Sequence, residues 1–344
     1  MVVSHATNLK YLSGFTGSSG FLVLAAGESR LLTDGRYEAQ VRQRVDEGLM
    51  AAVAVERVDS RYDASLARML ARLGARRVGF EAGHVTVATL RRWQDLAPHI
   101  DWQPTEDVVE RQRAIKDAGE LAIFRRAGAA LAGVARALGS WLALDRTEKE
   151  VAGDIDRAIV DAGFSGPAFP TIVASGPNSA FPHARPTDRR LSDGDLVVLD
   201  FGGVLGGYCV DLTRVAVIGQ AAREAESLYA SVRDAQAAAL AAVRAGVAGS
   251  AVDRAARHVL ESRGLGEAFL HGTGHGLGLE VHEAPRIARA DSGAGDKLEA
   301  GMVCTIEPGA YLDGFGGVRL EDDVFVTAEG CEVLTEAPRD LIVV

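Results

Sequence analysis

The stretch LVVLDFGGVLGGYCVDLTRVAVIG, residues 196–219, decides the fold of the second half of the chain. Two apolar runs flank the glycine-rich segment 202–207, a pattern typical of a β-hairpin. Each run carries one acidic residue, Asp200 in the first and Asp211 in the second. The hairpin is expected to bring these two carboxylates together on neighbouring strands. Two buried like charges are costly unless one carboxylate is protonated or a cation lies between them.

Three more polar residues stand at or beside apolar runs further along the chain: His275 in HGTGHGLGLEVHE, Glu307 in GMVCTIEPGAY and Glu321 in GGVRLEDDVFV. Taken singly, each has an ordinary interpretation, since an acidic residue at a strand end is usually a turn or cap residue. Taken with the hairpin pair, they make four carboxylates and one imidazole. This is the ligand set expected for two divalent cations that share bridging carboxylates.

The glycine-rich motifs do not indicate other kinds of site. HGTGH places two histidines four positions apart, but its glycines disfavour a helix and no HExxH zinc motif is present. GTGHGLG and GFTGSSG lack the lysine of a phosphate-binding loop and the context of a dinucleotide-binding fold. We therefore expect neither a zincin nor a phosphate-binding loop.

Two domains are predicted, with a boundary at the polar segment 101–110. Residues 1–105 alternate short apolar runs with helical patterns, which predicts an α/β domain with a partly parallel sheet. In residues 111–344 two helices precede a set of strands, and this order then repeats. The duplication predicts an α+β domain with a pseudo-twofold, curved antiparallel sheet backed by helices.

Composition narrows the range of partners and compartments. The 344 residues include 37 Lys and Arg against 47 Asp and Glu, a formal net charge of −10. This balance argues against nucleic acid and against an anionic membrane surface as partners. The start of the chain has no signal-peptide pattern, and its three cysteines form no CxxC pair. We therefore expect a cytoplasmic protein.

The ordered series formed by the hairpin carboxylates, His275, Glu307 and Glu321 resembles the five-ligand signature of the pita-bread dinuclear metallopeptidases, which share the creatinase/aminopeptidase fold. The resemblance is closest to bacterial Xaa-Pro dipeptidase (prolidase) and Xaa-Pro aminopeptidase. FPTIVASGPNSAFPHARPTD matches a further family stretch, and NLKYLSGFTGSSGFLVL and LLTDGRYEAQ match the N-terminal domain. The resemblance thus covers nearly the whole chain. MVVSH matches the first strand, so this domain is expected to be shortened by one leading helix.

The resemblance assigns a metal role to each of these residues. It implies that Asp211 and Glu321 bridge two divalent ions, that Asp200 completes one site, and that His275 and Glu307 complete the other. Manganese is favoured by the oxygen-rich ligands, with cobalt and zinc as alternatives. A bridging hydroxide would be the nucleophile, and Glu307 would also carry a proton to the leaving nitrogen.

The resemblance also implies residues that hold the substrate. His183 and His282 would bind it and stabilise the tetrahedral intermediate, although lone histidines are more often structural. Arg286 would take the free carboxylate of the substrate, the alternative being a solvated surface arginine. The remaining expected substrate or supporting residues are His271, Arg319, Tyr208 and Thr213.

These implications predict a metal-dependent dipeptidase, a prolidase and a homodimer, that cleaves the bond before proline. The main alternative is an Xaa-Pro aminopeptidase, which would use the same site on longer peptides. Methionine aminopeptidase fits poorly because about 105 residues precede the catalytic domain. A non-catalytic peptide-binding protein is a further alternative, disfavoured because an unused cluster of buried carboxylates would destabilise the fold.

Overall fold

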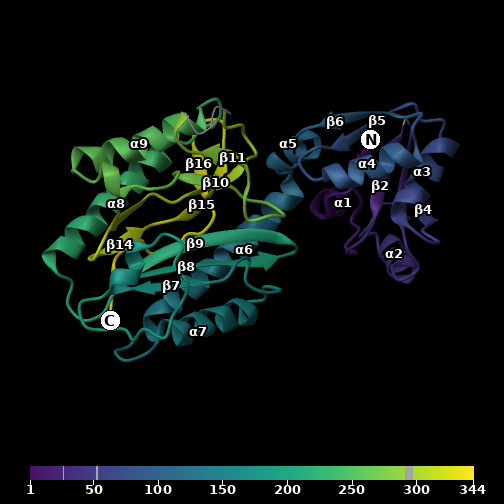
Figure 1. The fold of residues 1–344 in the computed structure, drawn as a ribbon. Coiled ribbons are helices and arrows are strands. Elements are labelled where there is room, and N and C mark those ends of the chain that lie inside the picture. Colours follow the sequence, from purple (N-terminus) through teal and green to yellow (C-terminus); the bar gives the residue numbers. More distant parts are fainter. Residues whose placement is uncertain (26, 52, 291–296) are drawn as a thin grey trace. The chain divides into compact units, whose positions relative to one another are not determined.

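The computed structural model describes residues 1–25, 27–51, 53–290 and 297–344 (Figure 1). The chain divides into two compact units, Met1–Arg113 and Ala114–Val344, with helix α5 (Val108–Ala114) at the division. None of the helices in these described residues combines the length and apolarity that a membrane span requires.

The first unit is built on a six-stranded sheet in the order β4-β3-β2-β1-β5-β6. Its strands are β1 (Val2–Val3), β2 (Phe21–Ala25), β3 (Glu28–Thr33), β4 (Ala54–Arg57), β5 (Arg77–Glu81) and β6 (Asp101–Thr105). Its helices are α1 (Ala6–Ser13), α2 (Glu38–Asp46), α3 (Tyr62–Arg72) and α4 (Val87–Leu96). Three strand pairs are parallel and two antiparallel, which confirms the partly parallel sheet.

The helices of the second unit begin at clear sequence signals. They are α6 (Ala118–Ala137), α7 (Glu148–Asp161), α8 (Arg223–Ala242) and α9 (Gly249–Ser262). Thr147 and Glu150, whose spacing is that of a capping box, form one at the start of α7, and Asp117 and Glu120 form another at the start of α6. Each box satisfies two backbone N–H groups that a helix start leaves without partners.

The second unit contains two main sheets. The first has the order β17-β9-β8-β7, with strands β7 (Ile172–Ser175), β8 (Leu196–Leu205), β9 (Tyr208–Val217) and β17 (Ile342–Val343). The second has the order β11-β10-β12-β15-β16, with strands β10 (Gly274–Gly276), β11 (Glu283–Ile287), β12 (Val303–Ile306), β15 (Asp322–Val326) and β16 (Cys331–Val333). A separate pair joins β13 (Gly309–Leu312) to β14 (Gly316–Arg319).

The predicted hairpin is formed by β8 and β9, which pair over their full length. Its turn is tighter than the segment 202–207 that we expected, since only Gly206 and Gly207 lie outside the strands. Both have positive φ, 59° and 90°, and a two-residue hairpin turn favours glycine at such positions. The longer strands carry Asp200 and Asp211 inside the ladder rather than beside the turn.

Helices cover the outer faces of these sheets (Figure 1). Alternate residues of β8 separate two hydrophobic cores: Leu199 and Phe201 pack in the core that includes α6 and α7, while Leu196 and Val198 pack in the core that includes α8 and α9. Because side chains of a strand alternate between faces, Asp200 lies on the face toward the second core. The sheets therefore enclose the polar residues between two pairs of helices.

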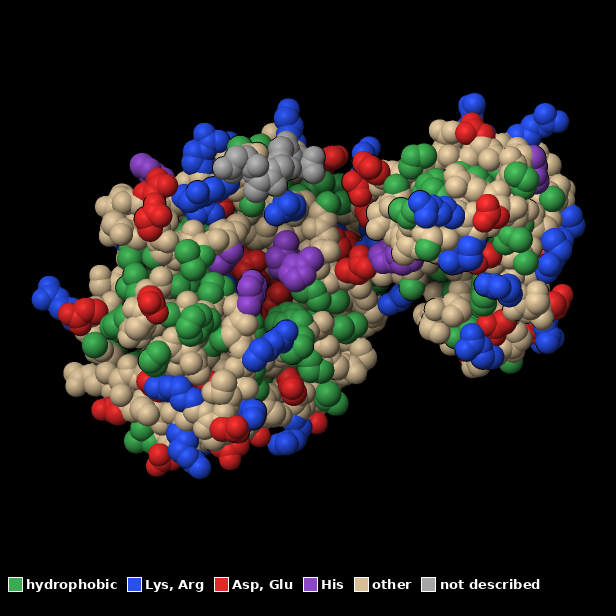
Figure 2. All heavy atoms as spheres, in the orientation of Figure 1, with side chains coloured by type: hydrophobic (Ala, Val, Ile, Leu, Met, Phe, Trp, Pro, Cys, Tyr) green, Lys and Arg blue, Asp and Glu red, His purple; other side chains and the backbone are tan. Residues whose placement is uncertain are grey.

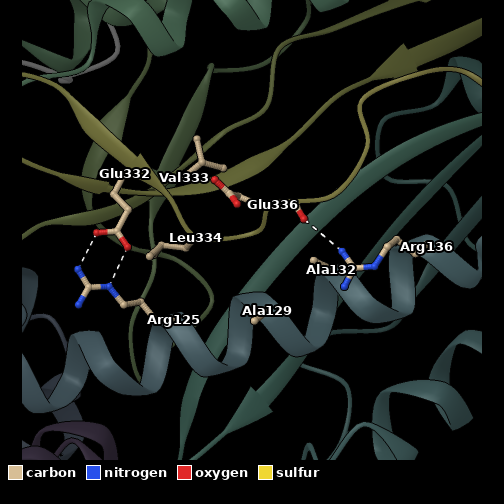
Figure 3. A pocket seen from close by; sticks show the side chains of 8 residues that line it. All are labelled: Arg125, Ala129, Ala132, Arg136, Glu332, Val333, Leu334 and Glu336. Atoms are coloured by element: carbon tan, nitrogen blue, oxygen red, sulfur yellow. Dashed lines mark hydrogen bonds and ion pairs between the residues drawn. The ribbon is translucent and has the colours of Figure 1, made fainter.

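Helix α6 also packs closely on the chain that follows β16 (Figure 3). A Cβ at Gly128 would lie 2.2 Å from the carbonyl oxygen of Leu334, so only glycine permits this approach. Arg125 on the same helix donates two hydrogen bonds of 2.7 Å to Glu332, and Arg136 donates to the carbonyl of Glu336 at 3.4 Å. These contacts fix the C-terminal segment against α6.

Candidate metal centre

The hairpin places two of the expected ligands on one face of the first sheet. Asp200 is opposite Thr213 in the ladder, and Asp211 is opposite Gly202. Directly opposed residues share a face, as do residues two apart, so Asp200, Asp211 and Thr213 all point the same way. Both carboxylates are buried.

The second sheet supplies the other three residues. Asp211, His275 and Glu321 offer ligand atoms that all lie within 4.8 Å of one another. Glu321 directly precedes β15, and its Oε2 accepts a 2.6 Å hydrogen bond from the hydroxyl of Thr213. Glu307 directly follows β12, with its Oε1 at 3.4 Å from Nε2 of His275. The structure thus brings together residues that lie as far apart in sequence as Asp200 and Glu321.

Several oxygen atoms in this cluster have no protein partner. Among the described residues, Oδ1 of Asp200, Oδ1 of Asp211 and Oε1 of Glu321 are buried and accept no hydrogen bond. A buried acceptor without a partner costs free energy, and a buried negative charge costs more. Three such oxygens beside an imidazole fit a group of divalent cations, for which carboxylate and imidazole are suitable ligands.

The titration of these groups reflects their crowding. Burial raises the pKa of Asp211 well above its usual value, and the charges of Glu321 and Asp200 raise it further. Burial likewise raises the pKa of Glu321, and repulsion from Glu307 raises it further. Burial also raises the pKa of Glu307. Burial lowers the pKa of His275, which favours the neutral imidazole that binds metals. In the absence of a cation these carboxylates therefore hold their protons to a higher pH than isolated carboxylates do.

Arg319 supplies a fixed positive charge beside the cluster. Its guanidinium is buried and donates to Oδ2 of Asp200, to the hydroxyl of Thr213 at 3.2 Å and to the hydroxyl of Tyr311 at 2.8 Å. The pair with Asp200 leaves only the other oxygen of that carboxylate available to a cation. Arg319 thereby offsets part of the negative charge and holds Asp200 in one orientation.

Three residues that sequence reasoning missed support the expected ligands. Thr305 donates to Oε1 of Glu307 at 3.1 Å, and Asp323 accepts a 2.9 Å hydrogen bond from the backbone N–H of Asp211. Thr305 and Asp323 each lie two positions from a ligand glutamate, a same-face spacing that could have revealed them. Tyr311 had no such signal, because it reaches Asp200 only through Arg319 on the paired strand β14.

Histidines surround the carboxylates, and Figure 2 shows them beside acidic atoms on the face of the second unit. The rings of His275 and His282 have their centroids 4.3 Å apart. Nε2 of His271 lies 2.8 Å from the hydroxyl of Tyr311. Burial lowers the pKa of His271 and of His282. His183 is exposed and follows Pro182, whose carbonyl accepts a hydrogen bond from Arg319.

Arg286 lies on the same face of its sheet as His275, because the two are directly opposed across β10 and β11. Its side chain is exposed and lines a cavity of about 380 Å³ with His271 and Gly272. Arg257, Arg289 and Glu267 also line this cavity, and Arg257 is paired with Asp253, so its surroundings keep a small excess of positive charge. This geometry suits an anionic group bound near the metal cluster.

Tyr208 is not brought to the cluster. It lies three positions before Asp211 on β9, and an odd spacing on a strand puts the two side chains on opposite faces. Its hydroxyl donates to Oε1 of Glu120 on α6 at 2.7 Å, and its ring packs edge-on against Phe124. Tyr208 therefore points away from the face on which Asp211 lies, and the supporting role expected for it at the cluster does not follow from this position.

Comparison with known proteins agrees with this geometry. Residues 122–328 match the model of metallopeptidase family M24, and residues 1–115 match the creatinase/prolidase N-terminal domain. A Xaa-Pro dipeptidase of Pyrococcus horikoshii is 32% identical over 342 residues, covering 99% of this chain and 94% of that protein.

Solved structures are similar over the full length. A Xaa-Pro dipeptidase from Bacillus anthracis superimposes with a TM-score of 0.95 at 32% identity, covering 100% of this chain and 94% of the other. An X-Pro aminopeptidase from Thermotoga maritima gives a TM-score of 0.90 at 33% identity, with 100% and 97% covered. These likenesses support the pita-bread fold and a divalent-metal hydrolase. The chain belongs to metallopeptidase family M24 and carries a creatinase/prolidase domain at its N-terminal side.

Proposed function

We propose that this metallopeptidase is an Xaa-Pro dipeptidase, which hydrolyses the peptide bond before proline in dipeptides. The observation that carries the proposal is the group of buried carboxylate oxygens without partners around His275. Relatives that match the chain from end to end are named Xaa-Pro dipeptidases, which supports the substrate class. A non-catalytic role is disfavoured because unneutralised buried charges would destabilise the fold.

The residues that would bind each cation, and the preferred metal, are inferred from the ligand atoms that the cluster offers. Asp211 and Glu321 would be shared by two cations, with Asp200 completing one site and His275 and Glu307 the other. We propose manganese, since four carboxylates and one imidazole form an oxygen-rich set, with cobalt and zinc as alternatives. When bound, such cations lower the pKa of a water molecule and neutralise negative charge that develops on the substrate.

The protein's own residues would handle the proton and the substrate. Glu307 would accept the proton of the attacking water and pass it to the leaving proline nitrogen. His183 and His282 would donate hydrogen bonds to the carbonyl oxygen as negative charge grows there. Arg286 would bind the free carboxylate of the dipeptide, with His271 lining the same cavity.

The alternative proposal is an Xaa-Pro aminopeptidase. It is favoured by one observation, the exposed position of Arg286 on a cavity that is large enough for residues beyond the proline. The two activities differ in whether Arg286 closes the space behind the proline or leaves it open. The X-Pro aminopeptidase of Thermotoga maritima is as similar in sequence as the dipeptidases are.

The deciding experiment compares hydrolysis of Ala-Pro and Ala-Pro-Ala with added manganese. We expect the wild type to prefer Ala-Pro, and Arg286→Ala to lose about 10- to 100-fold in kcat/KM on Ala-Pro, as loss of a charged hydrogen bond implies. Arg254→Ala, an exposed arginine on α9, is the matched control. Selective cleavage of the tripeptide by the wild type would replace the dipeptidase proposal with the aminopeptidase one.

We also propose a homodimer that works in the cytoplasm. Its three cysteines are free thiols, as expected in a reducing compartment. Sedimentation of the metal-loaded protein tests the oligomeric state directly, and a monomer at micromolar concentration would contradict the dimer.

A further inference from the structure

Glu148 is a fully buried carboxylate that the metal cluster does not use. It is the first residue of α7, and both of its oxygens accept hydrogen bonds. Oε1 accepts from the backbone N–H and the hydroxyl of Ser175, both at 2.7 Å, and from the Asn178 amide at 3.1 Å. Oε2 accepts from the backbone N–H of Thr187 at 2.9 Å and from its hydroxyl at 2.6 Å.

Every group that faces Glu148 in these hydrogen bonds is a donor, so the site requires a residue that only accepts. Burial alone would raise the pKa of Glu148, but the hydrogen bonds from Thr187 and Ser175 outweigh it and hold this pKa below its usual value. Glu148 is therefore ionised at neutral pH. Arg189 is paired with Asp195 and also donates to the Ser175 hydroxyl at 2.7 Å, so it supports a donor to Glu148 rather than pairing with Glu148 itself.

The donors lie at both ends of the loop 175–187, which contains His183. The middle of this loop is held from the other side, where the backbone N–H of Gly317 donates to the Ser179 hydroxyl at 2.8 Å. The carbonyl of Pro182 accepts a 3.2 Å hydrogen bond from Arg319, the arginine paired with Asp200. The backbone on which His183 stands is thus fixed between Glu148 and the metal cluster.

We propose that Glu148 is a positioning residue for His183: it holds both ends of the loop 175–187, so that the imidazole meets the substrate in a fixed place. This inference rests on the proposed function, in which His183 stabilises the charge that develops on the substrate. Glu148 itself contacts neither substrate nor metal. Its contribution is therefore greatest in the transition state, where small displacements of a binding group have large effects on rate.

Glu148→Gln tests the proposal, because glutamine keeps the size but turns an NH₂ group toward donors. We expect kcat on Ala-Pro to fall about 10- to 100-fold with little change in KM and with full manganese content. Glu150→Gln is the matched control, since Glu150 lies on the same helical turn and its hydrogen bonds go to Thr147 in the capping box. It should leave kcat unchanged and alter Tm little, because glutamine also completes a capping box. An unchanged kcat in folded Glu148→Gln overturns the inference.

A double-mutant cycle shows whether Glu148 acts through His183. In a His183→Ala background, Glu148→Gln should lower kcat by less than about twofold, because the imidazole that Glu148 positions is already absent. The same loss in both backgrounds would show that Glu148 acts elsewhere and would overturn the inference. Full activity of His183→Ala alone would instead remove His183 from the proposed function, and the inference with it.

Thr187→Val provides a second variant if Glu148→Gln does not fold. Valine removes one donor to Glu148 and keeps the shape and backbone of the loop. We expect the same decrease in kcat, smaller in size, and the same loss of effect in the His183→Ala background. An unchanged kcat in Thr187→Val would overturn the inference.

Discussion

Asp211 is the most crowded of the candidate ligands. Its backbone N–H is bound by Asp323, its Oδ1 has no partner among the described residues, and Glu321 and Asp200 repel its charge. In a protein without cations this carboxylate destabilises the fold, while with cations it would serve as a ligand, as proposed above. Its effects on stability should therefore have opposite signs in the two states.

Asp211→Asn should raise Tm of the chelator-treated protein at pH 7, by about 2–4 °C for each kcal/mol of repulsion that is relieved. The same variant should bind manganese at least about 100-fold more weakly, because loss even of a residue behind a ligand can cost that much. Differential scanning fluorimetry with and without manganese measures both effects. Asp188→Asn, which removes an exposed carboxylate, should change neither.

The pH dependence of stability should reveal Glu148. Its folded pKa lies below the usual 4.5, so in the acid range the folded state binds fewer protons than the unfolded state. Its contribution is complete above pH 4.5 and is lost as pH falls through the folded pKa. The difference in unfolding free energy between wild type and Glu148→Gln should therefore shrink below pH 4.5 in urea titrations. A constant difference would contradict an ionised Glu148.

Sequence reasoning at the scale of residues worked best where several signals coincided. Asp200, Asp211, His275, Glu307 and Glu321 could be proposed because each combines an acidic or imidazole side chain with an apolar strand. The interpretation of Tyr208 ignored strand alternation, which puts odd spacings on opposite faces. The role of Glu148 could not be foreseen, since its donors come from a loop whose path the sequence does not specify.

The short strand β10 illustrates how an element positions a ligand. Its three residues place His275 between Gly274 and Gly276. A Cβ at Gly274 would lie 2.0 Å from the carbonyl oxygen of Thr305, and one at Gly276 would lie 2.0 Å from that of Ala284. Both neighbouring strands therefore approach the backbone of β10 more closely than any side chain would allow.

Gly274→Ala should destabilise the protein by about 1–3 kcal/mol, the usual cost of overpacking, and weaken manganese binding because His275 shifts with the strand. Gly153→Ala is the matched control, since a Cβ there meets nothing within 4 Å inside helix α7. That substitution should stabilise the fold by about 0.4–1 kcal/mol. Urea unfolding and manganese titration of both variants separate the two effects.

At the scale of elements, prediction failed where local signals were weak. The strand β6 was taken for a boundary because it is polar and contains Pro104, but it lies at the edge of its sheet, where proline is tolerated. The helix α1 has no side-chain cap and so had no start signal. Helix α7, in contrast, begins at Thr147 and Glu150, whose spacing in the sequence is that of a capping box.

For the whole molecule, all five expected ligands belong to the unit Ala114–Val344. Calorimetry should therefore show two transitions, of which only one moves to lower temperature when a chelator removes the metal. At manganese concentrations about 100-fold above its Kd, that transition should gain about 2.7 kcal/mol of stability. Equal shifts of both transitions would contradict a site confined to the second unit.

The distribution of ligands over the two sheets also has a consequence for biosynthesis. Asp200 and Asp211 come from one sheet, and the last ligand, Glu321, comes from the other, beside a C-terminal segment whose Pro338 and Ala337 carbonyls bind Arg214. A nascent chain that still lacks Glu321 and this segment holds only part of the proposed site. Peptidase activity is therefore expected only after both sheets have been synthesised and have folded together, so incomplete chains should be inactive.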